Sequence, residues 1–135
     1  MNGLHLIADL HDCRCPPGRL LDAPGLERLC VDACVRHGLT VVGRLFHAFR
    51  DAAGEAAGVT GTVVLAESHL AVHTWPEIAA VTLDVYVCNF SGDNSARAQA
   101  LFADMIAAFA PCHAERNAVT RGRPEPPATA GLPPG

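Results

Sequence analysis

The densest group of reactive side chains in this sequence lies within the eleven residues Glu67–Glu77. It combines a serine hydroxyl, two imidazoles, an indole and two carboxylates, from Ser68, His69, His73, Trp75, Glu67 and Glu77. Serine and histidine could serve a hydrolase, but no Gly-x-Ser-x-Gly turn surrounds Ser68. The two histidines would share a metal ion on a helix. The stretch instead alternates like a strand, on which residues four apart lie about 13 Å apart, so we expect no metal here.

Six cysteines form a second reactive set, and their even number would allow disulfides. Against disulfides, the apolar fraction is 50% and Met1–Asp12 has no basic segment before its apolar residues. Both features favour a reducing cytoplasm over export. The spacing of the first cysteines does not fit a zinc site, and two others sit four apart on an expected helix, where thiols behave as small hydrophobes. The cysteines are Cys13, Cys15, Cys30, Cys34, Cys88 and Cys112.

The overall composition limits the classes of partner that the protein can bind. The net charge is −4, which argues against binding of a nucleic-acid backbone. No apolar run reaches the roughly 18 residues of a membrane-spanning helix. We therefore expect a small-molecule partner, with neither nucleic acid nor membrane.

The segment Glu67–Glu77 resembles the processing site of the short prokaryotic S-adenosylmethionine decarboxylases, which are pyruvoyl enzymes. Their signature, Glu-Ser-His-Leu-x-x-His-Thr-Trp-Pro-Glu, is complete here. Further pieces resemble the family in the same order along residues 3–122: Gly3–Leu10, Phe46–Phe49, Gly58–Gly61 and Asp84–Cys88. The third piece carries Thr60 where the family usually has serine.

The resemblance implies that the chain cuts itself between Glu67 and Ser68, giving chains 1–67 and 68–135. The Ser68 Oγ would attack the carbonyl carbon of Glu67, and the Thr60 hydroxyl would steady the resulting intermediate. His73 matches the residue that removes the Ser68 α-proton, and imidazole suits that task near neutral pH. The product is a pyruvoyl group at residue 68, so no external cofactor is needed.

The resemblance also implies roles in turnover. The pyruvoyl ketone would form a Schiff base with the substrate amine and accept electrons as carbon dioxide leaves. Cys88 matches the family's proton donor. Phe49 and Trp75 match aromatic positions near the adenine, where stacking is physically sensible, and Glu77 matches a carboxylate suited to ribose hydroxyls. The implied function is conversion of S-adenosylmethionine to S-adenosylmethioninamine and carbon dioxide for spermidine synthesis.

The sequence departs from the family pattern at three places. Ile78–Ala80 replaces Tyr-Gly-Tyr, Asn89–Gly92 follows the catalytic cysteine where glycine is usual, and Leu4 replaces arginine. Two alternatives therefore stay open: a pyruvoyl-dependent ornithine or arginine decarboxylase, and a non-catalytic family member. His47 and His69 lie near the site without a role. The other histidines are taken as ordinary: His5, His11, His37 and His113.

The elements that must position these residues follow from hydrophobic periodicity. Apolar residues recur at helical spacing between Asp22 and Gly38 and again from Asp93 or Asn94 to Pro111. Val81–Cys88 alternates cleanly, which is typical of a half-buried strand. Val59–Ala66 is almost continuously apolar and β-branched, which indicates cover on both faces.

The predicted fold is α+β, a two-layer sandwich of antiparallel sheet with two helices on one face, in the order β-α-β-β-β-α-β. With 135 residues, we expect one domain, residues 1–120. Residues 121–135 hold five of the ten prolines and are predicted to be a disordered tail. Because the sheet's second face would be left open, we expect a homodimer to cover it.

Overall fold

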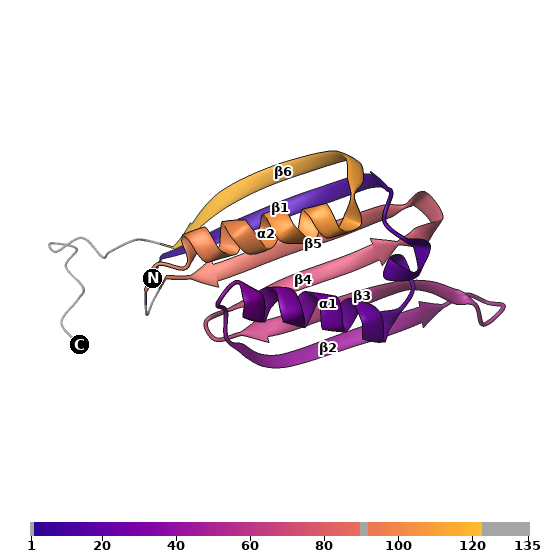
Figure 1. Ribbon diagram of the computed structural model, residues 1–135, viewed down its shortest axis with the longest axis horizontal. Helices are drawn as coiled ribbons and strands as arrows, with labels where there is room; N and C mark the ends of the chain where they lie inside the picture. The colour runs from indigo at the N-terminus through magenta and orange to yellow at the C-terminus, as the bar shows by residue number, and fades with distance from the viewer. Residues whose placement is uncertain (1, 90–91, 123–135) are drawn as a thin grey trace, which may run out of the picture.

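The computed structural model describes residues 2–89 and 92–122. The described residues form six strands and two α-helices, whose arrangement is shown in Figure 1. Short 3₁₀ turns precede α1 and β5, at Pro17–Leu20 and Pro76–Ile78. In chain order the elements are β1 (Asn2–Cys13), α1 (Ala23–Arg36), β2 (Val41–Arg50), β3 (Ala56–Leu65), β4 (Ser68–Trp75), β5 (Ala80–Cys88), α2 (Ser95–Phe109) and β6 (Pro111–Gly122).

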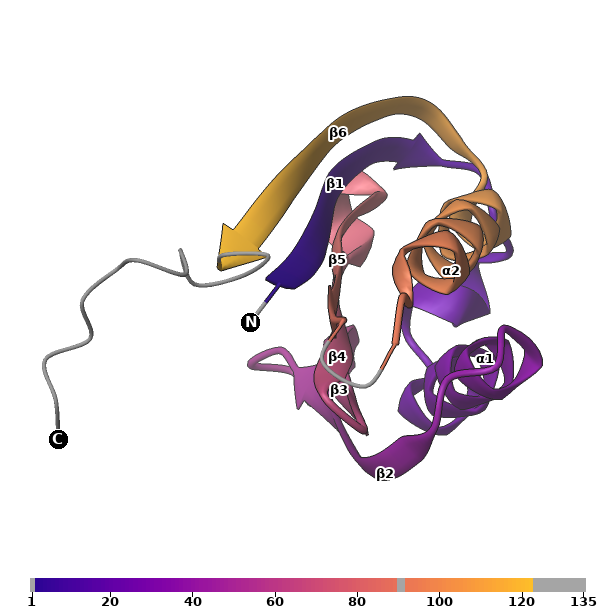
Figure 2. The ribbon, with the colours of Figure 1, turned by 90° about the vertical axis from the view of Figure 1, so that its left-hand side faces the viewer.

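The strands form one antiparallel sheet in the order β2-β3-β4-β5-β1-β6. Figure 2 shows both helices on the same side of this sheet, which confirms the predicted two-layer architecture. The predicted order is one strand short, because four strands lie between the helices. Turns at residues 66–67 and 76–79 separate β3, β4 and β5, so the segment between the helices contains four strands where the predicted order has three.

The core lies between the helices and one face of the sheet. Strand β5 shows why: Val81, Leu83, Val85 and Val87 alternate to the helix side and are at most 2% exposed. The apolar stripe of α2 packs against them, with Ala98, Leu101, Phe102, Met105, Ile106 and Phe109 all buried. Side chains that alternate the other way leave a second face without helices, which we call the open face.

The open face is less apolar along β3 than predicted. Thr60 and Thr62 are partly exposed on it, and the apolar residue of this row is Val64, 44% exposed. The apolar run of Val59–Ala66 therefore reflects burial against the helices, while β-branched threonines supply the outer side of the strand.

The end of the chain departs from the predicted domain boundary. β6 pairs with β1 as far as Gly122, two residues into the predicted tail. Residues 123–135 lie outside the described residues. Among the residues described, neither helix is long and apolar enough to cross a membrane.

All six cysteines lie in the described part of the chain and carry free thiols. Cys30 and Cys34 are buried in α1, as predicted, and burial raises the pKa of the Cys34 thiol to about 11. Desolvation also raises the pKa of Cys30. These two thiols are therefore packing groups with little thiolate character near neutral pH.

Candidate active site

Ser68 begins β4, directly after a strained turn. The pairing of Leu65 with Ser68 leaves only Ala66 and Glu67 to connect β3 to β4. Glu67 has φ 75°, in the left-handed region, which costs a residue with a side chain roughly 1–2 kcal/mol. The peptide bond from Glu67 to Ser68 is thus placed at an exposed turn next to a strained backbone.

The Ser68 hydroxyl is held by the neighbouring strand. Its Oγ accepts a hydrogen bond from the backbone N–H of Cys88 at 2.9 Å. The side-chain amide of Asn94 donates a hydrogen bond to the Cys88 carbonyl at 3.2 Å. The structure therefore brings together two predicted site residues, Ser68 and Cys88, at adjacent strand ends.

A second group of predicted residues gathers at the other end of the open face. His73 stacks on Trp75 with ring centroids 4.1 Å apart, and Phe49 lies 6.0 Å from the His73 ring. Thr60 pairs with His73 across β3 and β4. Trp75 and Phe49 also line a hollow of about 290 Å³ together with Glu77. His47 joins this group through its edge contact with Phe49, centroids 4.8 Å apart.

The two groups do not meet within one chain. His73 follows Ser68 by five residues along β4, which at about 3.3 Å per residue is roughly 16 Å. Alternation also puts the two side chains on opposite sides of the strand. Proton transfer needs heavy atoms about 3 Å apart or one bridging water, so His73 cannot reach Ser68 of its own chain in this fold.

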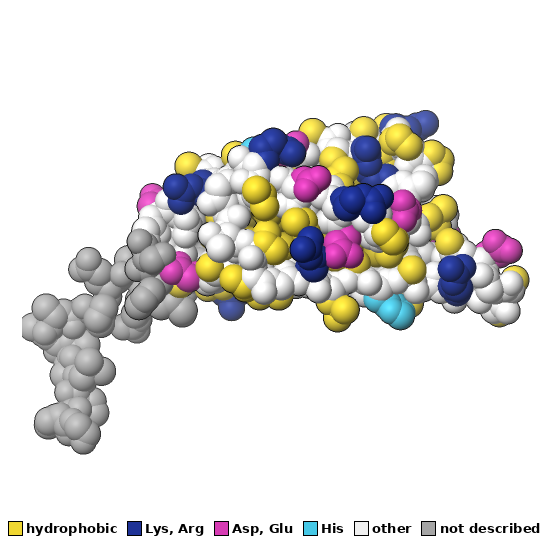
Figure 3. Space-filling model, turned by 60° about the horizontal axis from the view of Figure 1, so that its bottom comes forward, with side chains coloured by type: hydrophobic (Ala, Val, Ile, Leu, Met, Phe, Trp, Pro, Cys, Tyr) yellow, Lys and Arg dark blue, Asp and Glu magenta, His cyan; other side chains and the backbone are white. Residues whose placement is uncertain are grey.

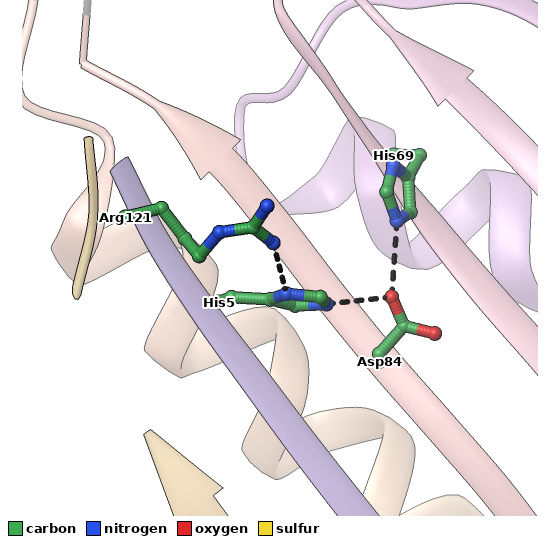
Figure 4. A network of polar contacts seen from close by, with 4 residues as sticks. All are labelled: His5, His69, Asp84 and Arg121. Atoms are coloured by element: carbon green, nitrogen blue, oxygen red, sulfur yellow. Dashed lines mark hydrogen bonds and ion pairs between the residues drawn. The ribbon is translucent and has the colours of Figure 1, made fainter. Parts of the chain in front are cut away.

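A third group, which the sequence did not reveal, surrounds Asp84. Figure 4 shows His5 and His69 both directed at this carboxylate, and Arg121 contacts His5 on the side away from Asp84. The side chains come from four strands, so their proximity depends on sheet register. The available signal was that Asp84 alternates onto the same face as Cys88. The partner His5 could not be found without the β1–β5 pairing.

Thr74 is the other residue of the signature segment whose task becomes visible only in the structure. It is 1% exposed, and its Oγ1 donates to the Leu20 carbonyl at 2.7 Å while accepting the Val59 N–H at 2.8 Å. This hydroxyl ties β4 to β3 and to the turn before α1. It thereby fixes the backbone between His73 and Trp75.

Comparisons with known proteins identify the family. The family model described as S-adenosylmethionine decarboxylase matches residues 4–122. An S-adenosylmethionine decarboxylase proenzyme of Parasynechococcus marenigrum is 40% identical over 100 residues, which cover 74% of this chain and 70% of the relative. The proenzyme of Bacillus cytotoxicus is 42% identical over 86 residues, 64% of this chain and 61% of the relative.

The fold is shared with a solved structure. The crystal structure of the adenosylmethionine decarboxylase from Aquifex aeolicus superposes with a TM-score of 0.77 at 29% identity, covering 91% of this chain and 92% of that one. The family model spans almost the whole described chain, and the relatives match at about 40% identity. The chain therefore belongs to the S-adenosylmethionine decarboxylase proenzyme family, a family of pyruvoyl-dependent carboxy-lyases.

Proposed function

We propose that this chain is a self-processing decarboxylase that converts S-adenosylmethionine to S-adenosylmethioninamine and carbon dioxide. The observation that carries the proposal is the placement of Ser68. Its hydroxyl stands immediately after an exposed, strained turn and is held by the backbone of Cys88, the proposed proton donor.

The proposed processing step begins with two residues that are adjacent in the chain. Ser68 Oγ attacks the carbonyl carbon of Glu67, so that the chain is joined by an ester instead of an amide. Removal of the Ser68 α-proton then expels the new α-carboxylate of Glu67 and separates chains 1–67 and 68–135. The dehydroalanine left at residue 68 takes up water and releases ammonia, which leaves a pyruvoyl group. Loss of the left-handed conformation at Glu67 favours the cleaved state, because strain of about 1–2 kcal/mol is released.

The surroundings of residue 68 fit a pyruvoyl group formed there from the serine. The Cys88 N–H that now holds the Ser68 oxygen can donate equally to a ketone oxygen. A pyruvoyl group supplies the electron sink for loss of carbon dioxide from an amino acid. Cys88 provides the proton that replaces the carboxylate on the substrate carbon.

We infer that His73 and Thr60 act on the Ser68 of a second copy of the chain. Within one chain His73 lies roughly 16 Å along the strand from Ser68, yet the proposed step needs a base at the Ser68 α-proton. Two sheets packed through their open faces in opposite directions would bring each His73 group to the main chain of the other chain's Ser68, where the α-proton lies. The proposed assembly is therefore a homodimer of cleaved protomers.

The open face offers apolar surface for such a dimer. Large hydrophobic side chains at least 39% exposed occur on four of its strands: Leu45, Phe49, Val64, Trp75 and Val119. Covering these side chains would stabilise the pair by roughly 25 cal/mol for each Å² of apolar surface removed from water. On the face of the molecule that Figure 3 shows, by contrast, basic and acidic side chains are interspersed.

The hollow beside His73 suits the nucleoside of S-adenosylmethionine. Trp75 and Phe49 present aromatic surface for adenine and for the positive sulfonium, and Glu77 on the same hollow can accept hydrogen bonds from ribose hydroxyls. Ornithine and arginine have no base to stack. We therefore propose the nucleoside substrate.

A basic amino acid is kept as the second candidate because of the residues next to the hollow. Ile78 is 67% exposed, and Ala79 has φ 49° where the family usually has glycine. The other departing segment includes Phe90 and Ser91, which lie outside the described residues. Since all six thiols are free, we propose the cytoplasm as the compartment.

Release of labelled carbon dioxide tests this proposal. The purified full-length protein is incubated separately with carboxyl-labelled S-adenosylmethionine, ornithine and arginine, with Ser68→Ala as the inactive control. We expect release from S-adenosylmethionine alone. Release from ornithine or arginine alone would show that the substrate is that amino acid and not S-adenosylmethionine. If a cleaved protein released carbon dioxide from none of the three, decarboxylation of these substrates would be refuted.

A further inference from the structure

A polar hollow of about 180 Å³ lies beside the peptide bond that self-processing would cut. Three segments line it: the connection from α1 to β2 at residues 38–40, the turn from β3 to β4 at Ala66 and Glu67, and the N-terminal end of α2 at Asn94 and Arg97. Figure 1 shows that turn and the beginning of α2 at the same end of the sheet. Of the residues that line this hollow, the proposed processing step uses only Glu67.

Arg97 supplies the positive charge of the hollow. Its Nη1 donates a hydrogen bond to Asn94 Oδ1 at 3.0 Å, and a Cβ atom on Gly38 would lie 3.3 Å from its Nε, so the guanidinium is held beside bare backbone. Within the described part of the chain Arg97 forms no ion pair, whereas three other arginines each pair with a carboxylate. Because a guanidinium has five N–H donors, Arg97 keeps donors for an anion.

Hydrogen bonds connect the hollow to Ser68. The side-chain amide of Asn94 donates to the Cys88 carbonyl at 3.2 Å, and the Cys88 N–H donates to Ser68 Oγ at 2.9 Å. Ser68 alternates to the same side of β4 as the buried Leu70, which is the side covered by the helices. The Ser68 oxygen and Arg97 of α2 therefore lie on the same side of the sheet.

Self-processing would create a carboxylate at this place. In the ester that joins the Glu67 carbonyl carbon to Ser68 Oγ, loss of the Ser68 α-proton to the base breaks the Cβ–Oγ bond. Both electrons of that bond leave on the oxygen, which becomes part of the α-carboxylate of Glu67. The same group is a neutral amide in the uncut chain, so its charge appears only during processing.

We propose that Arg97 binds the new α-carboxylate of Glu67 and stabilises it as the leaving group, an inference that rests on the proposed function. Cleavage frees Glu67 from its left-handed conformation, and its carboxylate can then turn into the hollow that Glu67 already lines. Hydrogen bonds between a guanidinium and a carboxylate are charge-assisted and frequently bidentate. Because both the amide and the ester are uncharged, Arg97 favours the elimination step and the cleaved state.

The time course of self-cleavage tests this role. Full-length wild type, Arg97→Gln and Arg97→Lys are made by cell-free synthesis and followed on denaturing gels. The matched control is Arg28→Gln, which removes an exposed arginine of α1. We expect Arg97→Gln to be cut about tenfold more slowly, because a hydrogen bond to a charged group is lost. Arg97→Lys should be intermediate and Arg28→Gln should match wild type. Equal rates for wild type and Arg97→Gln would overturn the proposal.

An isotope effect separates slowed elimination from a general disturbance of the turn. Serine deuterated at Cα slows only the step that removes the α-proton. If Arg97 stabilises the leaving group, the isotope effect on cleavage is at least as large in Arg97→Gln as in wild type. A smaller isotope effect in Arg97→Gln would show that the attack of Ser68 had become limiting, which would contradict the proposed role.

The new carboxylate can also be observed directly by NMR. Labelling with [1-¹³C]glutamate marks the backbone carbonyl of every glutamate, and only that of Glu67 becomes a titrating carboxylate on cleavage. Its titration midpoint should lie a few tenths of a pH unit lower in cleaved wild type than in cleaved Arg97→Gln, the effect of an exposed ion pair. Arg28→Gln should match wild type.

The NMR result distinguishes failure of this inference from failure of the proposed function. A titrating signal with the same midpoint in wild type and Arg97→Gln would refute carboxylate binding by Arg97 and leave self-processing intact. A wild type without any such signal would be uncut, which would overturn the proposed function and this inference with it.

Discussion

At the scale of single residues, His73 and Cys88 lie in different parts of the sheet, and we propose that they act in different steps. We predict that His73→Ala leaves the chain largely uncut, because the proposed base for the Ser68 α-proton is gone. Cys88→Ala keeps the serine and the base, so it is still cut but loses about 10²–10⁴-fold in decarboxylation. Denaturing gels and carbon dioxide release measure the two effects. Normal turnover by Cys88→Ala would disprove its role as proton donor.

Trp75 provides a residue-scale test of the substrate. Its indole is 39% exposed and stacks on His73 at 4.1 Å. Base–aromatic stacking contributes about 1–3 kcal/mol, so Trp75→Ala should lower kcat/KM for S-adenosylmethionine by one to two powers of ten. Trp75→Phe, which keeps an aromatic face, should lose less. If the two variants behaved alike, stacking of the indole on adenine would be the wrong explanation.

At the scale of elements, the turn before β5 contains strain that one substitution can remove. Ala79 is in the left-handed region with φ 49°, which costs a residue with a side chain roughly 1–2 kcal/mol of folding free energy. Glycine avoids this cost, but its greater freedom in the unfolded chain lowers the stability of the folded state by about 0.4–1 kcal/mol. Ala79→Gly should therefore raise the free energy of unfolding by about 0.5–1 kcal/mol, measured by urea denaturation. The matched control Ala80→Gly, in buried strand, should lower it.

The contact between α1 and α2 has a pH dependence with a definite sign. Arg36 first and His37 second donate to Asp104 and hold the pKa of its carboxyl below the ordinary 3.8. A lowered folded-state pKa stabilises the protein above the unfolded-state value, and this stabilisation is lost as pH falls through the folded-state value. Because Asp104 is 37% exposed, the contribution is about 0.2–1 kcal/mol.

Asp104→Asn should accordingly lower the midpoint of thermal unfolding near pH 7. The difference between wild type and variant should shrink as the pH drops below about 4. Thermal unfolding monitored by circular dichroism at several pH values measures this trend. A difference that grows toward low pH would contradict the assignment of the carboxylate as the stabilising form.

At the scale of the whole molecule, the sequence predicted the fold better than the site. Alternation in Val81–Cys88 gave the correct faces of β5, because period two is a local property of a strand. Sheet register is not local, so the meeting of His5 with Asp84 was invisible. Resemblance grouped Ser68 and His73 in one site, whereas strand geometry separates them by roughly 16 Å.

This separation leads to a prediction about assembly. Ser68→Ala and His73→Ala should each stay uncut when expressed alone. In a mixed dimer, the His73→Ala chain still supplies Ser68 and the Ser68→Ala chain still supplies His73. One of the two sites is therefore complete, and the His73→Ala chain should be cut there. Differently tagged, co-expressed chains and a denaturing gel provide the measurement. Mixed dimers that form but contain no cut chain would refute the shared site.

The most direct test of the central claim is the intact mass of the purified wild-type chain. Self-processing predicts replacement of the 14.2 kDa chain by two chains of about half that mass, with the second lighter by one ammonia than a fragment 68–135 that begins with serine. Ser68→Ala should remain whole. A wild-type chain that stays whole, or a second fragment that begins with a free serine amine, would contradict the account.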